Sequence, residues 1–132
     1  MALDILIVDD EADIRRLIAG ILKDEGFESR EAGDSAEAFE AIRKRQPNLI
    51  ILDVWLQGSE YDGLQILELV RKENPNQQVI MISGHATFDM AVSATKIGAY
   101  DFLTKPFKTD VLLHTIGRAL ETVRLRTHNE EF

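Results

Sequence analysis

The sequence predicts an α/β fold in which helices cover both faces of a parallel sheet. Three short apolar runs carry this prediction, because a continuous apolar run is typical of a strand that is buried on both sides. Segments in which apolar residues recur at helical spacing alternate with these runs, which favours right-handed crossovers between parallel strands. The three runs span residues 5–8, 49–52 and 79–82.

The segments around the first two runs predict two helices and one edge strand. Apolar residues recur at helical spacing over residues 14–22, and Gly26 follows where a C-terminal cap is expected. Residues 27–32 contain fewer apolar side chains and three charged ones, as an edge strand can. Asp34, with Glu37 three residues later, resembles the start of the second helix.

The second half of the chain continues the alternation of strands and helices. Residues 54–63 contain two glycines and no clear period, which predicts a loop before the third helix. The segment 86–97 mixes small and large residues, so it predicts a helix whose buried face is poorly defined. Residues 101–103 are predicted to be a short strand, and residues 111–123 place apolar side chains on one side of a last helix.

Five strand and helix units favour the flavodoxin-like strand order 2-1-3-4-5. This order puts the half-polar second strand and the short fifth strand at the edges of the sheet. Residues 1–122 are expected to form this one domain. Residues 123–132 become charged and carry no stop signal, so we interpret them as an extension of the last helix that leads into a linker.

Composition excludes several classes of function. The chain has no cysteine, which excludes disulfides, thiolate metal sites and cysteine nucleophiles and agrees with a cytoplasmic location. A net charge of −8 argues against binding of this domain to nucleic acid, because affinity for phosphates comes mainly from Lys and Arg. No apolar run approaches the roughly 20 residues of a membrane span, so we expect no membrane association.

Carboxylates follow two of the apolar strands at the point where each strand ends. Asp9 and Asp10 come directly after the first run, and Asp53 comes directly after residues 49–52. In the predicted order these strands are neighbours at the topological switch point, so the three carboxylates should converge on one crevice. Their repulsion requires a cation, and oxygen ligands with room for water and phosphate suit Mg²⁺. Each aspartate also has a structural interpretation, as a turn former or as an acid at a helix N-terminus.

Two further polar side chains are expected to face this crevice. Ser83 follows the fourth strand and Lys105 the fifth, and they would offer a hydroxyl and an ammonium group to a phosphoryl oxygen. Taken alone, Ser83 could be a turn former and Lys105 a solvated charge. Together with the carboxylates they form the set of groups that phosphoryl transfer to an aspartate requires.

On these residues the sequence resembles the receiver domains of two-component response regulators over essentially its whole length. Asp9 and Asp10 look like the acidic pair of that family, Asp53 like its phosphorylated aspartate and Ser83 like its switch hydroxyl. The lysine of the family's Lys-Pro pair would be Lys105. Within the family, the sequence is most similar to the NtrC class of nitrogen-regulation regulators.

The resemblance also implies a role for each of these residues. Asp10 and the phosphorylated aspartate would ligate Mg²⁺ directly, together with the backbone carbonyl of Trp55, and Asp9 would act through a water molecule. Phe102 would be the switch aromatic, and Pro106 would follow a cis peptide bond. The side chain of Trp55 could contact a partner, anchor the loop or do neither.

Partners follow from the same resemblance. A histidine kinase would donate the phosphoryl group, and the domain would not be an enzyme beyond self-phosphorylation from small phosphodonors and autodephosphorylation. Helix 86–97, strand 101–103 and the last helix would form a homodimer face that responds to phosphorylation. A separate output domain, absent from this sequence, would bind DNA and control transcription.

The sequence departs from the family pattern in the loop after the aspartate. Leu56-Gln57 stands where the family usually has Met-Pro, and the stretch to Asp62-Gly63 is about two residues longer. The resemblance therefore does not fix the shape of this loop or the lifetime of the phosphoryl group. Phe102 replaces the more familiar tyrosine, so rotation of this ring would be read by packing and not by a phenolic hydrogen bond.

Three other functions suit the same fold. A cofactor binder of the flavodoxin type would need a phosphate-binding loop after the first strand, where Asp9-Asp10-Glu11 would repel an anion. An interaction module that works without phosphorylation should have lost one of Asp10, Asp53 or Lys105. A magnesium-dependent phosphatase with an aspartyl intermediate would normally add a general acid and a substrate-capping region, for which this chain has no room.

Overall fold

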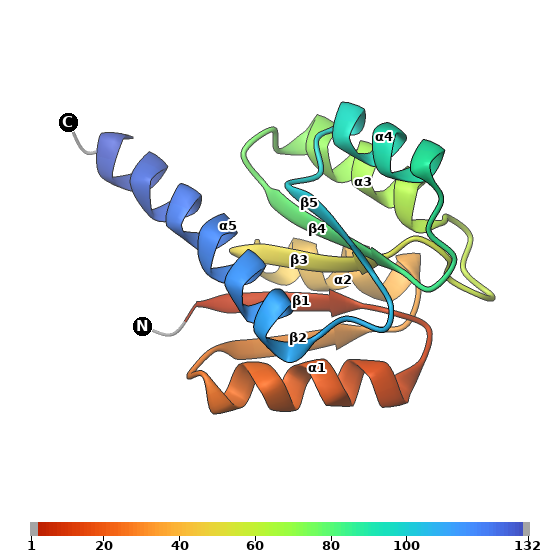
Figure 1. The fold of residues 1–132 in the computed structure, drawn as a ribbon. Coiled ribbons are helices and arrows are strands. Elements are labelled where there is room, and N and C mark those ends of the chain that lie inside the picture. Colours follow the sequence, from red (N-terminus) through yellow and green to blue (C-terminus); the bar gives the residue numbers. More distant parts are fainter. Residues whose placement is uncertain (1–2, 131–132) are drawn as a thin grey trace.

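The computed structural model describes residues 3–130, and the side chains of residues 3–122. The five strands form one parallel sheet in the order β2-β1-β3-β4-β5, which confirms the predicted fold class and strand order (Figure 1). The strands are β1 (Asp4–Val8), β2 (Glu28–Ala32), β3 (Leu49–Asp53), β4 (Gln78–Ser83) and β5 (Asp101–Thr104). The helices are α1 (Ala12–Asp24), α2 (Ser35–Lys44), α3 (Gly63–Glu73), α4 (Phe88–Ile97) and α5 (Thr109–Glu130).

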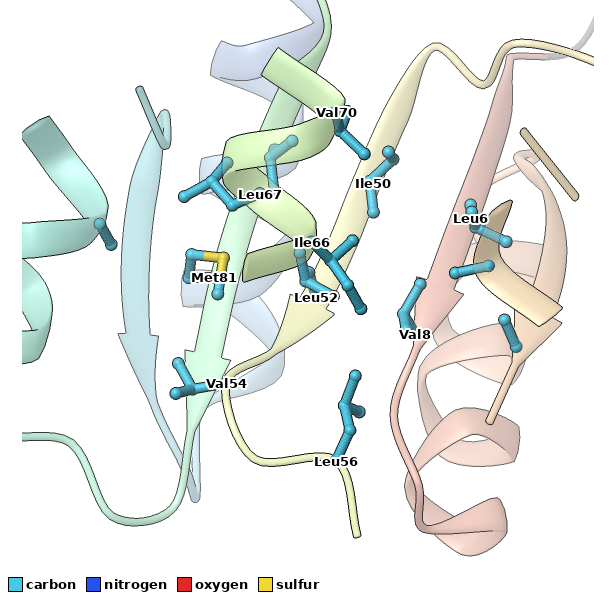
Figure 2. Packing of buried hydrophobic residues seen from close by; sticks show 14 residues of the cluster. Leu6, Val8, Ile50, Leu52, Val54, Leu56, Ile66, Leu67, Val70 and Met81 are labelled. Carbon is cyan, nitrogen blue, oxygen red and sulfur yellow. The ribbon is translucent and has the colours of Figure 1, made fainter. Parts of the chain in front are cut away.

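Two apolar layers form because helices cover both faces of the sheet. Successive side chains of a strand point to opposite faces, so Ile7 and Ile51 pack toward α1 and α5, whereas Leu6 and Ile50 pack toward α2, α3 and α4. Figure 2 shows Ile66 of α3 lying against the second of these layers. Each such side chain is at most 1% exposed, and its burial stabilises the fold by ~1.5–3 kcal/mol.

The first residues of α2 and α4 follow from the side chains that cap their N-termini. The side chain of Asp34 accepts a hydrogen bond from the Glu37 N–H at the start of α2, as the sequence predicts. Thr87 caps α4 in the same way, so this helix begins at Phe88, two residues later than the predicted 86–97. Ala94 is the one fully buried residue of α4, which agrees with the poorly defined face of that segment.

In α1 and α5, some apolar residues at helical spacing are buried and others are exposed. Leu17 shares the helical spacing of the apolar residues in α1, but it is 56% exposed because Ile18 and Leu22 face the sheet. In α5, Leu112 is buried and Val111 is exposed. The predicted inward position of residue 123 lies outside the described side chains.

The half-polar strand β2 and the short strand β5 lie at the two edges of the sheet, as the sequence predicts. This leaves β1 and β3 as neighbours in the centre, with their carboxyl ends on the same side. None of the helices within residues 3–130 combines the length and apolar character needed to cross a bilayer.

Candidate functional site

Three carboxylates converge where β1 and β3 end. Val8 lies opposite Leu52 in the register of these parallel strands, which brings the residues that follow them to the same edge of the sheet. Carboxylate oxygens of Asp9, Asp10 and Asp53 all lie within 4.8 Å of one another. Asp9 and Asp53 are buried, and Asp10 is half-buried.

Lys105, the residue directly after β5, reaches this cluster. Its Nζ lies 2.8 Å from Oδ2 of Asp9 and 3.1 Å from Oδ2 of Asp53, so one ammonium group joins two of the three carboxylates. The Lys105 N–H donates to the carbonyl of Ser83 at 2.8 Å, which continues the β4–β5 ladder. The peptide bond between Lys105 and Pro106 is cis.

Ser83 is the last residue of β4. Its side chain is fully buried, and its Oγ accepts a hydrogen bond from the His85 N–H at 3.1 Å. Gly84 and His85, the two residues that follow, line the cleft at this point, and the role of Ser83 toward a phosphoryl oxygen stays a prediction.

The cleft above the carboxylates has a volume of about 420 Å³. Five of its lining residues could not be assigned from the sequence, because no charge or spacing rule distinguishes loop residues that line a site from those that do not; they are Glu11, Leu56, Gln57, Gly84 and His85. The residues that line the cleft are Asp10, Glu11, Asp53, Trp55, Leu56, Gln57, Gly84, His85 and Lys105.

Burial and charge set the protonation of the two central groups. Burial raises the pKa of Asp53 to about 6 and the negative charge of Asp9 adds to this, although the hydrogen bond from Lys105 opposes it. Burial alone would lower the pKa of Lys105, but its hydrogen bonds to Asp9 and Asp53 outweigh this and raise the pKa above its usual value. Lys105 is therefore an ammonium ion throughout the neutral pH range.

The loop after β3 contacts two of the carboxylates through its backbone. The Gln57 N–H donates to Oδ2 of Asp10 at 3.1 Å, and the Trp55 N–H lies 3.4 Å from Oδ1 of Asp53. The Trp55 side chain is 49% exposed at the rim of the cleft. Leu56 is only 7% exposed and continues the apolar layer beyond Leu52, as Figure 2 shows.

Gly63, the first residue of α3, is packed against the backbone of the phosphoacceptor candidate. A Cβ at this position would lie 2.0 Å from the carbonyl oxygen of Asp53 and 2.7 Å from Cα of Val54. The Gly63 N–H also donates to the Val54 carbonyl at 2.8 Å. The Asp62-Gly63 pair was visible in the sequence, but the reason for the glycine appears only in the fold.

Phe102 is half-buried in β5, and it packs with the apolar layer that faces α3 and α4. Its partner in the strand register is Met81 of β4, two residues before Ser83. Phe102 therefore belongs to the same pair of strands as the serine and the lysine, but it lies on the outer part of the core and not in the cleft.

The donor set of this site fits a hard divalent cation. One ammonium group against three carboxylates leaves two negative charges uncompensated when all are ionised. All three acids offer oxygen atoms, which are the ligands that Mg²⁺ prefers, and the open cleft has room for water. Asp10 contributes most to this fit, since Lys105 does not contact its carboxylate.

The chain matches a known protein family over most of its length. Residues 5–117 match the family model of the response regulator receiver domain. The chain belongs to this family. Receiver domains are phosphoacceptors of signalling pathways, with an acidic pocket of the kind that Asp9, Asp10 and Asp53 form here.

Several relatives of this receiver domain are regulators named NtrX. The nitrogen assimilation regulatory protein NtrX of Azorhizobium caulinodans is 55% identical over 131 residues, which are 99% of this chain and 29% of that protein. The chain thus spans less than a third of the length of this curated relative. The crystal structure of the NtrX receiver domain from Brucella abortus has a TM-score of 0.87 and 56% identity, and the match covers 90% of this chain and 99% of the other.

A more distant receiver domain has been solved as a dimer. It is the beryllofluoride-activated NtrC4 receiver domain, with a TM-score of 0.84 and 38% identity. The match covers 90% of this chain and 97% of that one. These comparisons confirm the resemblance to the NtrC class that the sequence motifs indicated.

Proposed function

We propose that Asp53 of this receiver domain accepts a phosphoryl group from a histidine kinase in a reaction that requires Mg²⁺. The observation that carries the proposal is the convergence of Asp9, Asp10 and Asp53, with the ammonium group of Lys105 bound to Asp9 and Asp53. Nucleophile, metal ligands and a fixed positive charge thereby lie within one cleft, as aspartyl phosphorylation needs.

The reaction is a displacement at phosphorus. A carboxylate oxygen of Asp53 forms a new bond to the phosphorus atom of the donor. The bond from phosphorus to the histidine nitrogen, or to the acetate oxygen of acetyl phosphate, breaks and its electron pair leaves with the donor. Mg²⁺, when bound, neutralises charge on the phosphoryl oxygens.

Each site residue has a part in this proposal. Asp10, Asp53 and the backbone carbonyl of Trp55 would hold Mg²⁺, and Asp9 would act through a water molecule. Lys105, whose Nζ already lies 3.1 Å from Asp53, would hold a phosphoryl oxygen. The hydroxyl of Ser83, now buried, would have to turn toward the phosphoryl group.

That movement of Ser83 would be the link to output. It would free space for Phe102 and change the face formed by α4, β5 and α5, through which two copies of the domain would associate. Support comes from α4, which has Ala94 as its one fully buried residue and so can shift at low cost. Residues 1–122 would be the switch, and residues 123–132 would lead to an output domain that binds DNA and regulates transcription in response to nitrogen.

Mass spectrometry after incubation with acetyl phosphate and Mg²⁺ tests the proposal. We expect one added phosphoryl group, mapped to Asp53, and no addition when EDTA removes the metal. Asp53→Asn should abolish labelling, whereas Asp24→Asn, an exposed aspartate at the end of α1, serves as the matched control and should leave labelling intact. Equal labelling of the Asp53→Asn variant and the parent would refute the assignment.

The same experiment separates the other functions that suit this fold. An interaction module that works without phosphorylation would take up no phosphoryl group from either acetyl phosphate or a phosphorylated kinase. A phosphatase would release phosphate from many small phosphomonoesters with repeated turnover, whereas a receiver domain takes up one equivalent from a high-energy donor.

A further inference from the structure

The loop between β3 and α3 is fastened to the rest of the domain at three points. Leu56 is buried in the core, and the Gln57 N–H donates to Oδ2 of Asp10. Beyond these, Ser59 contacts the start of α2, which is 24 residues away in the sequence. This is the loop whose shape the resemblance to the family left open.

The contact with α2 is a closed ring of hydrogen bonds. The Ser35 N–H donates to Oγ of Ser59 at 2.9 Å, and the Ser59 hydroxyl donates to the carbonyl of Tyr61 at 2.7 Å. The Tyr61 N–H donates in turn to Oγ of Ser35 at 3.3 Å. Ser35 is 3% exposed, and its N–H is one of the first in α2, which has no acceptor within its own helix.

A turn from Leu56 to Ser59 connects the contact with α2 to the candidate metal site. The Ser59 N–H donates to the Leu56 carbonyl at 3.2 Å, and Gly58 between them has φ +77°, a left-handed conformation that glycine adopts without strain. Gln57 is held inside this turn, so the position of its N–H depends on both ends of the turn. One end is fixed by the buried Leu56 and the other by Ser59.

The orientation of the Asp10 carboxylate depends on the Gln57 N–H, whereas Asp9 and Asp53 have a second partner in Lys105. Asp9 and Asp53 both contact Lys105, whereas within residues 3–122 the Gln57 N–H is the one hydrogen-bond donor to the Asp10 carboxylate. It engages Oδ2 and leaves the other oxygen available to a cation. The orientation of Asp10 is therefore set by the loop and not by the lysine.

We infer that Ser59 and Ser35 are positioning residues for Mg²⁺ binding, because they hold the Gln57 N–H against Asp10. The inference rests on the proposed function, since it concerns the same metal site. It adds that this loop is part of the site, and that a serine on α2 and a serine on the loop act on metal affinity through Asp10.

Titration of the chain with Mg²⁺, followed by the fluorescence of its single tryptophan and by calorimetry, tests this inference. Trp55 lines the cleft and reports on it directly. One lost hydrogen bond of ordinary strength corresponds to about a fivefold change in an equilibrium constant, so Ser59→Ala should raise the Mg²⁺ dissociation constant about fivefold. Ser59→Thr, which keeps the hydroxyl, should restore it, and Ser93→Ala on the exposed side of α4 should have no effect.

A double-mutant cycle distinguishes positioning from general loosening of the fold. If Ser59 acts through Asp10, then Ser59→Ala should not weaken Mg²⁺ binding further in an Asp10→Asn background. An Mg²⁺ affinity equal to that of the parent in Ser59→Ala, or an equal loss in both backgrounds, would overturn the inference and leave the proposed function intact. A parent chain that shows no response to Mg²⁺ by either method would overturn both.

Discussion

At the scale of single residues, Asp53 is a carboxylate that the fold holds in an unfavourable place. It is 4% exposed and lies beside Asp9, and its pKa is raised to about 6, chiefly by burial. A carboxylate in such a position destabilises the domain whenever it is ionised. The buried position that raises the pKa of Asp53 is therefore also a source of instability, because an ionised carboxylate is poorly solvated there.

This predicts how stability depends on pH without metal. Because the pKa of Asp53 is raised on folding, its favourable contribution is complete below pH 4 and is lost as the pH rises through about 6. A shift of about two units corresponds to roughly 3 kcal/mol. In EDTA, Asp53→Asn should therefore gain stability over the parent between pH 4 and 7. Urea unfolding at several pH values checks this, and parallel curves for the two proteins would contradict it.

A second prediction separates Asp10 from its neighbour Glu11. Both line the cleft, but only Asp10 has a carboxylate oxygen within the cluster that could hold a metal. Asp10→Ala should raise the Mg²⁺ dissociation constant at least about tenfold, since it removes a ligand, and Glu11→Ala should change it by less than about threefold. Tryptophan fluorescence measures both, and similar constants for the two variants would count against the ligand assignment.

Residue types and strand ends are enough to predict which charged groups meet. Asp9, Asp10 and Asp53 come together because parallel strands that are neighbours end at the same edge, and this could be read from two apolar runs. The hydrogen bond that Oγ of Ser83 accepts from the His85 N–H could not be predicted, because it depends on the shape of the turn after β4.

At the scale of elements, buried strands were predictable and loops were not. Residues 5–8, 49–52 and 79–82 all lie within fully buried strands. Short continuous apolar runs are typical of strands that are covered on both faces. The loop after β3 gave no such signal. Its shape depends on contacts such as Ser35 with Ser59, which are far apart in the sequence and involve residues that are common in loops.

The close approach of α3 to the end of β3 restricts the residue type at position 63. Gly63 lies so close to the end of β3 that a Cβ would overlap with the Asp53 carbonyl, and backbone atoms cannot move aside cheaply. Gly63→Ala should therefore destabilise the domain by ~1–3 kcal/mol, as overpacking does. It should also slow labelling of Asp53 by acetyl phosphate, because the strand end that carries the nucleophile must shift.

Gly20 provides the matched control for this prediction. It lies on the exposed side of α1, and a Cβ there would meet no atom within 4 Å. Gly20→Ala should stabilise the domain by roughly 0.5–1 kcal/mol, because alanine favours the helix, and should leave labelling unchanged. Chemical denaturation and mass spectrometry of the two variants provide the comparison. Equal effects of the two substitutions would show that the close approach at Gly63 has no consequence.

At the scale of the whole molecule, the site and the proposed association face are linked through β4 and β5. Ser83 ends β4, Lys105 directly follows β5, and Phe102 packs within β5 opposite Met81. The face beyond them includes a shallow hollow on α5 lined by Leu113, Gly117 and Arg118. Coupling between two such regions is typically ~1–3 kcal/mol, so phosphorylation should adjust an equilibrium and not create a permanent assembly.

The last prediction concerns this equilibrium. With Mg²⁺ and beryllium fluoride as a phosphate mimic, the dimer dissociation constant should fall about tenfold. Each copy carries a net charge of −8, so the dimer should also tighten as salt screens the repulsion. Arg118→Glu on α5 should weaken it, whereas Lys23→Glu on α1 makes the same charge change away from the face and should act only through net charge. Sedimentation measures all four effects, and an unchanged constant with the mimic would exclude this coupling.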